Sequence, residues 1–278
     1  QAGLPVVTTI HHPISRDLNV ALVGASGWRT RLLVRRWHSF LTMQARVAAQ
    51  LNHIVTVSSA SAADIATDFG VLPSAIKVIP NGVDTELFRA LPDVIRKPAQ
   101  LIATASADAP LKGLAVLLQA FKILSTDRPT LQLILIASPK PGGDTEALIR
   151  QLALGDRIQF VGGASHADIV RLYAESTVAV VPSLYEGFGL PAVEAMASGI
   201  PLVSSDGGAL AEVVGEGGLL VPAGDTKALA GAIDAVLSDA DLAAELVKRG
   251  QQRAYRTFSW SVCAQQMVEQ YQQCIDLC

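Results

Sequence analysis

The sequence predicts an α/β protein built from parallel strands and covering helices in doubly wound layers. Short β-branched runs alternate with amphipathic stretches of helical period along most of the 278 residues. The alternation stops once, over 89–100, where "RALPDVIRKPAQ" contains two prolines and charges of both signs. We therefore expect two such domains joined by this linker.

The part before the linker is short of strands. Strands are expected over 6–10, 53–57 and 76–79, with a helix over 38–51 and another that is capped near Ser61. A complete doubly wound half needs about five or six strands. We therefore expect this part to be the end of a domain whose beginning is absent.

The part after the linker contains enough strand–helix units for a complete domain. Strands are expected over 101–105, 131–137, 157–161, 178–181, 200–205 and 218–221. Helices are expected to follow them over 113–125, 144–152, 166–175, 191–198, 209–214 and 225–237. The predicted organisation is a partial N-terminal domain over 1–90, a complete domain over 91–256, and a C-terminal helix over 257–278 that returns across the cleft.

The composition is that of an ordinary globular chain, with 50% hydrophobic and 17% charged residues. No apolar run approaches the roughly 18 residues that a membrane-spanning helix needs. Cys263, Cys274 and Cys278 crowd the last part of the chain without metal-ligand spacing. We interpret them as reduced thiols, and we expect a cytoplasmic protein.

The net charge of −3 hides a basic stretch near the N-terminus. Four arginines lie between Trp28 and Trp37, namely Arg29, Arg31, Arg35 and Arg36. Such a stretch can lie on anionic lipid at the inner face of a membrane, or contact an acidic partner. The alternative is a solvated connecting face whose two tryptophans cover the edge of a core. No nucleic-acid partner is expected.

The stretch "PSLYEGFGLPAVEAMASGIPLVSSDGG", residues 182–208, contains a G-x-G-x-x-A pattern typical of dinucleotide binding. In that motif the first glycine comes directly off the strand, but here "PSLYE" separates Val181 from Gly187. Pro191 also occupies a variable position, and the strand is not the first of its domain. An NAD site is therefore the less favoured interpretation.

The same loop suits a different anionic ligand. Backbone N–H groups of the G-F-G turn, and a helix that begins near Pro191, can hold phosphate or sugar oxygens. Glu186 and Glu194 bracket the turn, and carboxylates accept hydrogen bonds from hydroxyl groups. Taken alone, Glu194 is explained as an acid in the first turn of a helix, and Glu186 as a solvated loop residue. The two together favour a ligand site.

These residues resemble the Glu-x7-Glu signature of the retaining glycosyltransferases of family 4, within the glycosyl transferases group 1. That family has the GT-B fold of two Rossmann-like halves. Other segments resemble it in the same order: "VVTTIHHP", "HIVTVSSASAADIATDFGV", "IKVIPNGVDTELF", "LKGLAVLLQAF" and "GGLLVPAGDTKALAGAI". The resemblance covers nearly the whole chain, and it implies a complete donor-binding domain and a partial acceptor domain.

The resemblance also implies roles for single residues. Glu186 would hydrogen-bond the donor sugar near the reacting carbon, Lys112 would pair with the diphosphate, and Glu194 would accept hydrogen bonds from the ribose. His11, or His12 if the register is off by one, would lie at a strand edge facing the acceptor. Four successive amides would hold the sugar hydroxyls and the diphosphate: those of Gly187, Phe188, Gly189 and Leu190.

One position departs from the family. Five residues before Lys112, where the family has an arginine, this sequence has Ala107. Half of the usual cationic pair is therefore missing, which leaves donor affinity and donor identity open. Lys112 alone is also explained as a solvated lysine, but a cation at a helix start opposes the helix dipole, so an anionic partner is favoured.

Two further motifs are interpreted as structural. Asp239 and Asp241, in "DAD", are spaced like a metal-binding D-x-D motif, but they open an amphipathic stretch, and helix capping explains them better. Asn81 and Gly82, in "PNGVD", are expected to shape the turn before the linker.

The resemblance implies a hexosyltransferase that moves a sugar from a nucleotide-sugar donor, such as a UDP- or GDP-sugar, to a glycan, lipid or small-molecule acceptor. Configuration would be retained through a front-face route, without a metal or another cofactor. The alternatives are a truncated chain that binds nucleotide without turnover and, less favoured, an NAD-binding oxidoreductase. A glycosidase fits poorly, because two carboxylates on one loop–helix segment do not flank a bond from both faces.

Overall fold

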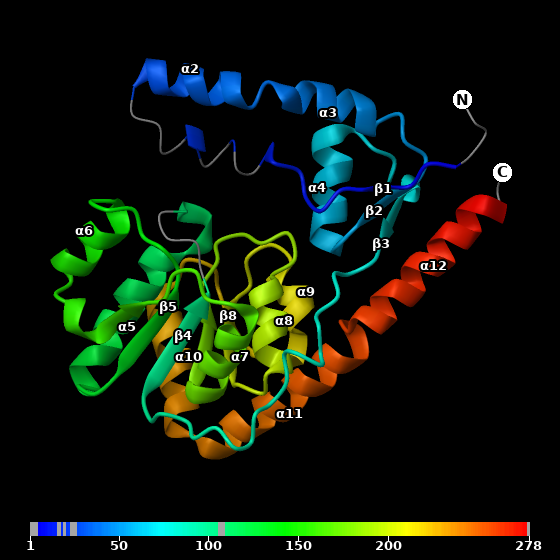
Figure 1. Ribbon diagram of the computed structural model, residues 1–278. Coiled ribbons are helices and arrows are strands. Elements are labelled where there is room, and N and C mark those ends of the chain that lie inside the picture. Colours follow the sequence, from blue (N-terminus) through cyan, green and yellow to red (C-terminus); the bar gives the residue numbers. More distant parts are fainter. Residues whose placement is uncertain (1–4, 16–17, 19–20, 23–26, 105–108, 277–278) are drawn as a thin grey trace. The chain divides into compact units, whose positions relative to one another are not determined.

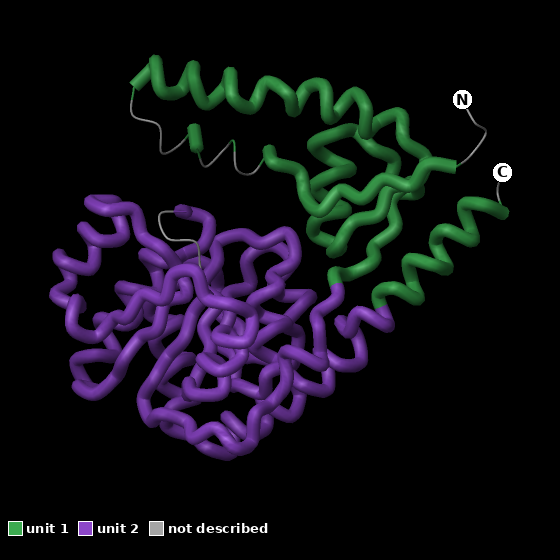
Figure 2. Tube along the Cα trace, viewed as in Figure 1, with its two compact units in different colours: residues 1–81, 263–278 green, residues 82–262 purple. Residues whose placement is uncertain are grey.

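The computed structural model describes residues 5–15, 18, 21–22, 27–104 and 109–276; Ala107 and Cys278 lie outside the described residues. The chain divides into two compact units (Figure 2). Unit 1 consists of Gln1–Asn81 and Cys263–Cys278, and unit 2 of Gly82–Val262. The chain therefore passes from unit 1 into unit 2 and returns to unit 1 within its last helix. The division between units falls at 81/82, before the linker expected over 89–100.

Unit 1 has a small parallel sheet in the order β1–β2–β3 (Figure 1). Its strands are β1 (Thr8–Thr9), β2 (Ile54–Thr56) and β3 (Ile76–Val78). Helix α3 (Phe40–Ala48) packs against α4 (Ser59–Phe69), whose start is capped by the Ser58 side chain. The core of this unit consists of Ile10, Ala48, Ile54, Ile65, Phe69 and Val71.

The basic stretch forms a helix of its own, α2 (Trp28–Trp37), instead of a connecting segment. None of its residues is buried, and Trp28 and Trp37 are 70% and 78% exposed. The expectation that the two tryptophans cover a core edge is therefore wrong. Four arginines among ten residues leave too little continuous apolar surface for the helix to pack into a core.

Unit 2 has a six-stranded parallel sheet in the order β6–β5–β4–β7–β8–β9. Figure 1 labels β4, β5 and β8 of this sheet. Its strands are β4 (Gln100–Thr104), β5 (Gln132–Ile136), β6 (Ile158–Phe160), β7 (Val178–Val181), β8 (Leu202–Ser205) and β9 (Leu219–Val221). Numbered within the unit, this is the doubly wound order 3-2-1-4-5-6, which reverses between β4 and β7. The predicted α/β class and the complete second domain are confirmed.

Helices cover both faces of this sheet, and its strands are therefore buried on both sides. They are α5 (Leu114–Asp127), α6 (Asp144–Gln151), α7 (His166–Glu175), α8 (Leu190–Ala197), α9 (Leu210–Val214), α10 (Thr226–Ser238) and α11 (Ala240–Thr257), followed by α12 (Trp260–Asp276). Each strand and helix expected between the linker and residue 237 is present to within two residues at either end, whereas the C-terminal helix expected from residue 257 begins at Trp260. Among the helices that the structure describes, none is both long and apolar enough to cross a membrane.

The "DAD" motif is a helix cap, as expected. The side chain of Asp239 accepts hydrogen bonds from the N–H groups of Asp241 and Leu242, at 3.0 and 2.9 Å, at the start of α11. These two N–H groups have no acceptor within the helix, so the carboxylate satisfies donors that the helix leaves open.

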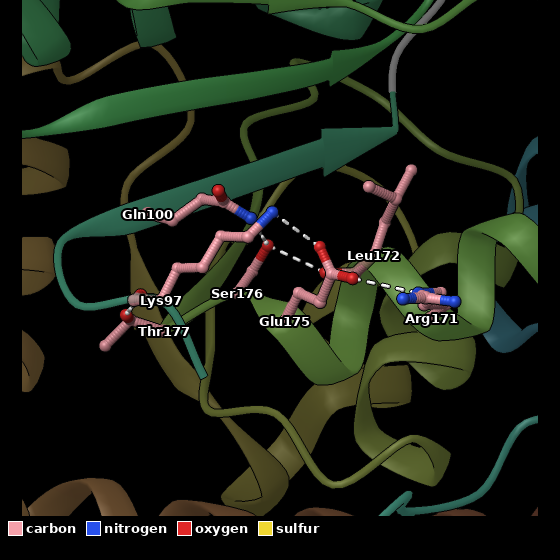
Figure 3. A network of polar contacts seen from close by, with 7 residues as sticks. All are labelled: Lys97, Gln100, Arg171, Leu172, Glu175, Ser176 and Thr177. Atoms are coloured by element: carbon pink, nitrogen blue, oxygen red, sulfur yellow. Dashed lines mark hydrogen bonds and ion pairs between the residues drawn. The ribbon is translucent and has the colours of Figure 1, made fainter. Parts of the chain in front are cut away.

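A polar network fastens the end of the linker to the amino edge of the unit 2 sheet (Figure 3). Glu175, the last residue of α7, accepts hydrogen bonds from Lys97 Nζ at 2.7 Å and from Arg171 Nε at 2.9 Å. Both bonds lower the pKa of the Glu175 carboxyl group. The hydroxyl of Thr177 donates to the carbonyl of Lys97 at 2.8 Å. This network lies where β4 and β7 begin, at the edge opposite to their carboxyl ends.

The two segments that pass between the units are joined to each other on the unit 2 side. Val83 pairs with Ser259 in a parallel bridge, and its N–H donates to the carbonyl of Phe258 at 2.7 Å. A Cβ atom on Gly82 would lie 2.5 Å from the ring of Trp260. Gly82 is therefore required because the ring of Trp260 leaves no room for a side chain. Its φ does not lie in the left-handed region, so a left-handed turn is not the reason for glycine at this position.

Candidate functional site

The strand order of unit 2 brings two of the predicted site residues together. Lys112 ends a short 3-10 turn in the segment between β4 and α5, and Glu186 lies in the loop that follows β7. These strands are neighbours at the point where the strand order reverses. In doubly wound sheets, the crevice at the carboxyl ends of such a pair is where ligands bind.

Lys112 and Glu186 form an ion pair. Lys112 Nζ lies 2.8 Å from Glu186 Oε1 and 3.0 Å from Oε2, and the two side chains are 35% and 12% exposed. The hydroxyl of the buried Ser183 donates to the same Oε1 atom at 2.8 Å. The interpretations of Glu186 as a solvated loop residue and of Lys112 as a solvated lysine are therefore wrong.

The backbone of the Glu186 loop is fixed by the loops on either side. The N–H of Leu184 donates to the carbonyl of Leu111 at 2.8 Å, in the loop after β4. The carbonyl of Glu186 accepts from the N–H of Ala209 at 2.9 Å, in the loop after β8. These bonds fix the position of Glu186 relative to the carboxyl ends of the strands.

Gly113 allows the loops after β4 and β7 to meet. It has φ 65°, and a Cβ atom at this position would lie 1.9 Å from the carbonyl oxygen of Pro182. Glycine accepts both the left-handed conformation and the close backbone contact. The residue directly after Lys112 is therefore required for the geometry of the ion pair.

The glycine turn leads into α8. Gly189 precedes this helix with φ 97°, and Leu190 and Pro191 are its first two residues. The N–H of Leu190 has no acceptor within the helix, and Pro191 has no N–H to satisfy. The ring of Phe188 is buried and packs edge-on against Phe258, with ring centroids 5.6 Å apart. The Phe188 side chain thus anchors the turn, whose backbone leads directly into the helix.

Glu194 is the fifth residue of α8, so it lies beyond the first turn. The expectation that it is a first-turn acid is wrong, because the helix begins at Leu190. Burial raises the pKa of the Glu194 carboxyl group, and the nearby His166 opposes this shift. We find no hydrogen-bond donor to this carboxylate within the described part of the chain. A largely buried acid of this kind destabilises the fold, which is typical of residues kept for function.

Tyr173 is a site neighbour that the sequence analysis missed. Its hydroxyl lies 3.2 Å from Thr104 Oγ1, at the end of β4, and 3.4 Å from the carbonyl of Pro191. The ring is fully buried, and burial together with the nearby Glu194 raises the pKa of Tyr173. A tyrosine in an amphipathic helix looks like any other core residue in the sequence. The structure shows that it ties β4 to the start of α8.

His11 belongs to unit 1. It follows β1 at the carboxyl end of the strand, its side chain is exposed, and its carbonyl accepts a hydrogen bond from Thr56 Oγ1 at 3.4 Å. This agrees with a position at a strand edge. Its role toward an acceptor stays a prediction, as does that of His12.

Comparison with protein families matches almost the whole chain. Residues 92–253 match the family described as "Glycosyl transferases group 1", and residues 1–87 match "Glycosyltransferase Family 4". The two matches meet near the boundary between units 1 and 2.

The chain is also similar to proteins named as glycosyltransferases. It is 46% identical to the MMP alpha-(1->4)-mannosyltransferase of Mycolicibacterium hassiacum, over 98% of this chain and 66% of that protein. It is 32% identical to the D-inositol 3-phosphate glycosyltransferase of Acidothermus cellulolyticus, over 93% of this chain and 59% of that protein. The chain thus spans about two thirds of these relatives or less.

Solved structures share the fold. Sucrose-phosphate synthase from Thermosynechococcus elongatus matches with a TM-score of 0.80 and 29% identity, over 98% of this chain and 68% of that one. Anabaena HepE in complex with UDP and glucose matches with a TM-score of 0.78 and 25% identity, over 95% of this chain and 70% of that one. The chain therefore belongs to the group 1 glycosyltransferases. This is the family that the glycine loop and its two glutamates resemble.

Proposed function

We propose that the protein to which this chain belongs transfers a hexosyl group from a nucleotide-sugar donor to an acceptor hydroxyl, with retention of configuration and without a metal. One observation carries the proposal. Lys112 and Glu186 meet at the reversal of the strand order, beside the start of α8. A cation, a carboxylate and a helix start at one sheet edge match the diphosphate and the sugar of such a donor.

Lys112 and the start of α8 would bind the diphosphate. The charge-assisted contact to the ammonium group and the dipole of the helix both favour a negatively charged ligand. As the sugar leaves, negative charge grows on the diphosphate, and these groups are already in place to stabilise it. This role needs no metal ion.

Glu186 and Glu194 would bind the two sugars of the donor. Glu186 would accept hydrogen bonds from the hexose, and Glu194 from the ribose hydroxyls. In the proposed front-face route, the bond from the anomeric carbon to the phosphate oxygen breaks while the bond to the acceptor oxygen forms on the same face. The acceptor proton moves to the departing phosphate oxygen. Neither carboxylate then has to act as a nucleophile.

The hexose is proposed to be mannose, because the 46% identical Mycolicibacterium protein is named as a mannosyltransferase. Anabaena HepE has been solved with UDP-glucose, so the nucleobase is left to the titration below. The acceptor is proposed to be a glycan, a lipid or a small molecule with a free hydroxyl. His11 is proposed to lie on the acceptor side.

We also propose that the protein is cytoplasmic and that it touches the inner face of a membrane through α2. Its four arginines are exposed, and so are the rings of Trp28 and Trp37. A helix that presents cations together with large aromatic side chains binds at an anionic lipid surface.

Replacing Lys112 with alanine should weaken the binding of a nucleoside diphosphate about tenfold or more, because it removes a charge-assisted contact. Titration calorimetry of the 278-residue chain with UDP, GDP, ADP and NAD measures this and identifies the nucleobase. The matched control is Lys97→Ala, which breaks a lysine–glutamate pair at the opposite sheet edge. Equal affinities for the Lys112→Ala and unmodified chains, or binding of NAD alone, would contradict the proposed site.

Glu194→Gln should stabilise the free protein at neutral pH and weaken nucleotide binding about tenfold. The pKa of Glu194 is raised in the folded protein. Its contribution to the free energy of unfolding is therefore favourable at pH values below the unfolded pKa of about 4.3, and this contribution is lost as the pH rises through the folded pKa. The glutamine variant should therefore unfold about 1–3 °C higher at pH 7.5, and no higher near pH 4.

Thermal unfolding at the two pH values, together with calorimetry, checks both effects. The control is Glu175→Gln, which should lower stability at pH 7.5, because its ion pairs lower the pKa of Glu175. A Glu194→Gln variant that is less stable at pH 7.5, or that binds nucleotide as well as the unmodified chain, would contradict the role of Glu194.

The chain should sediment with vesicles that contain phosphatidylglycerol and stay in solution with vesicles of phosphatidylcholine alone. Replacing Arg31 and Arg35 by glutamate should abolish sedimentation, because binding depends on the positive charge of α2. The same charge change at Lys122 and Lys248, two exposed lysines of unit 2, should have no effect. Equal binding by both double variants would exclude α2 as the contact.

A further inference from the structure

We propose that Glu186 makes the site prefer the nucleotide-sugar donor over the nucleoside diphosphate product. It would do so by exchanging its ion pair with Lys112 for hydrogen bonds from the donor sugar. This inference rests on the proposed function, because it assumes that the diphosphate binds at Lys112.

The ammonium group that a diphosphate would need is paired with Glu186 in this structure. Both oxygens of Glu186 lie within 3.0 Å of Lys112 Nζ. A diphosphate bears more negative charge than one carboxylate, so it can take Lys112 from Glu186. A diphosphate that takes the Nζ hydrogens now directed at Glu186 separates this pair, whether or not it carries a sugar.

Glu186 cannot follow Lys112 or turn out to water. Its backbone is fixed by the N–H of Ala209 and by a parallel bridge to Gly208. Its carboxylate is held by the hydroxyl of Ser183, and the side chain is only 12% exposed. When Lys112 turns to a diphosphate, Glu186 therefore stays in place and keeps one of the hydrogen bonds that it has now.

The state with a bare nucleoside diphosphate is consequently unfavourable. It leaves a largely buried carboxylate without its cation and close to a second anion, which is costly. The donor removes this cost, because the hydroxyl groups of its sugar donate to Glu186. After transfer the sugar is gone, the ion pair re-forms, and release of the product is favoured. The same glutamate thus selects the donor and helps to expel the product.

Glu186→Gln tests this exchange, because glutamine keeps the shape of the side chain and removes its charge. We expect the variant to bind the nucleoside diphosphate about fivefold more tightly than the unmodified chain, since Lys112 is no longer paired. We expect it to bind the corresponding nucleotide sugar at least about fivefold more weakly, since a hydrogen bond to a charged acceptor is lost. Calorimetry with UDP and UDP-glucose, and with GDP and GDP-mannose, measures both constants.

Three further measurements make the test specific. Glu175→Gln breaks the similar pair with Lys97 and should change neither affinity. Glu186→Ala should also tighten binding of the nucleoside diphosphate, so the exchange can still be tested if Glu186→Gln does not fold. The unmodified chain itself should bind the donor more tightly than the nucleoside diphosphate.

The exchange is overturned if Glu186→Gln binds the nucleoside diphosphate equally well or less well while the unmodified chain binds it. It is also overturned if the unmodified chain prefers the bare diphosphate. Failure of the unmodified chain to bind any of the nucleoside diphosphates would overturn the proposed function together with the exchange. A purely structural ion pair predicts weaker binding of both ligands by the variant.

Discussion

The parallel pairing of β4 with β7 is the constraint on which the candidate site depends. Lys112 and Glu186 are 74 positions apart in the sequence, and they meet only because Leu101 and Ile102 pair with Val178 and Ala179. Both faces of these strands are buried, so a shift by one residue would exchange the side chains that pack on the two faces of the sheet and would move the loops after the strands out of register. The network around Glu175 holds the amino edge of this pair (Figure 3). The loop contacts after the strands hold the other edge.

The electrostatics of unit 2 differ sharply between the two edges of the sheet. At the amino edge, Lys97 and Arg171 lower the pKa of Glu175, so this carboxylate contributes to stability at neutral pH. Near the carboxyl edge, burial raises the pKa of Glu194, and its charge works against the fold. Natural proteins tolerate such local conflicts mainly where a ligand resolves them. The same reasoning applies to Glu186, because its partner Lys112 is the cation to which a diphosphate would bind.

The sequence predicts most of unit 2, because continuous apolar strands and amphipathic helices leave a clear periodic signal. The motif around Glu186 also predicts the two glutamates of the candidate site, and the segment "LKGL" predicts its lysine. Ser183 and Tyr173 were missed, because a serine in a loop and a tyrosine in an amphipathic helix have no distinctive pattern. The exposed tryptophans of α2 and the second-turn position of Glu194 were predicted wrongly. Burial and helix starts depend on neighbours that are distant in the sequence.

The most direct test is a crystal structure of the chain with an intact nucleotide sugar. The account predicts a diphosphate oxygen within hydrogen-bonding distance of Lys112 Nζ, the ribose at Glu194, and Glu186 separated from Lys112 and bonded to the sugar. The account would be contradicted if the Lys112–Glu186 pair were intact and the nucleotide were bound in another hollow of unit 2. One such hollow is the groove along α5 and α10 that Arg128 and Lys227 line.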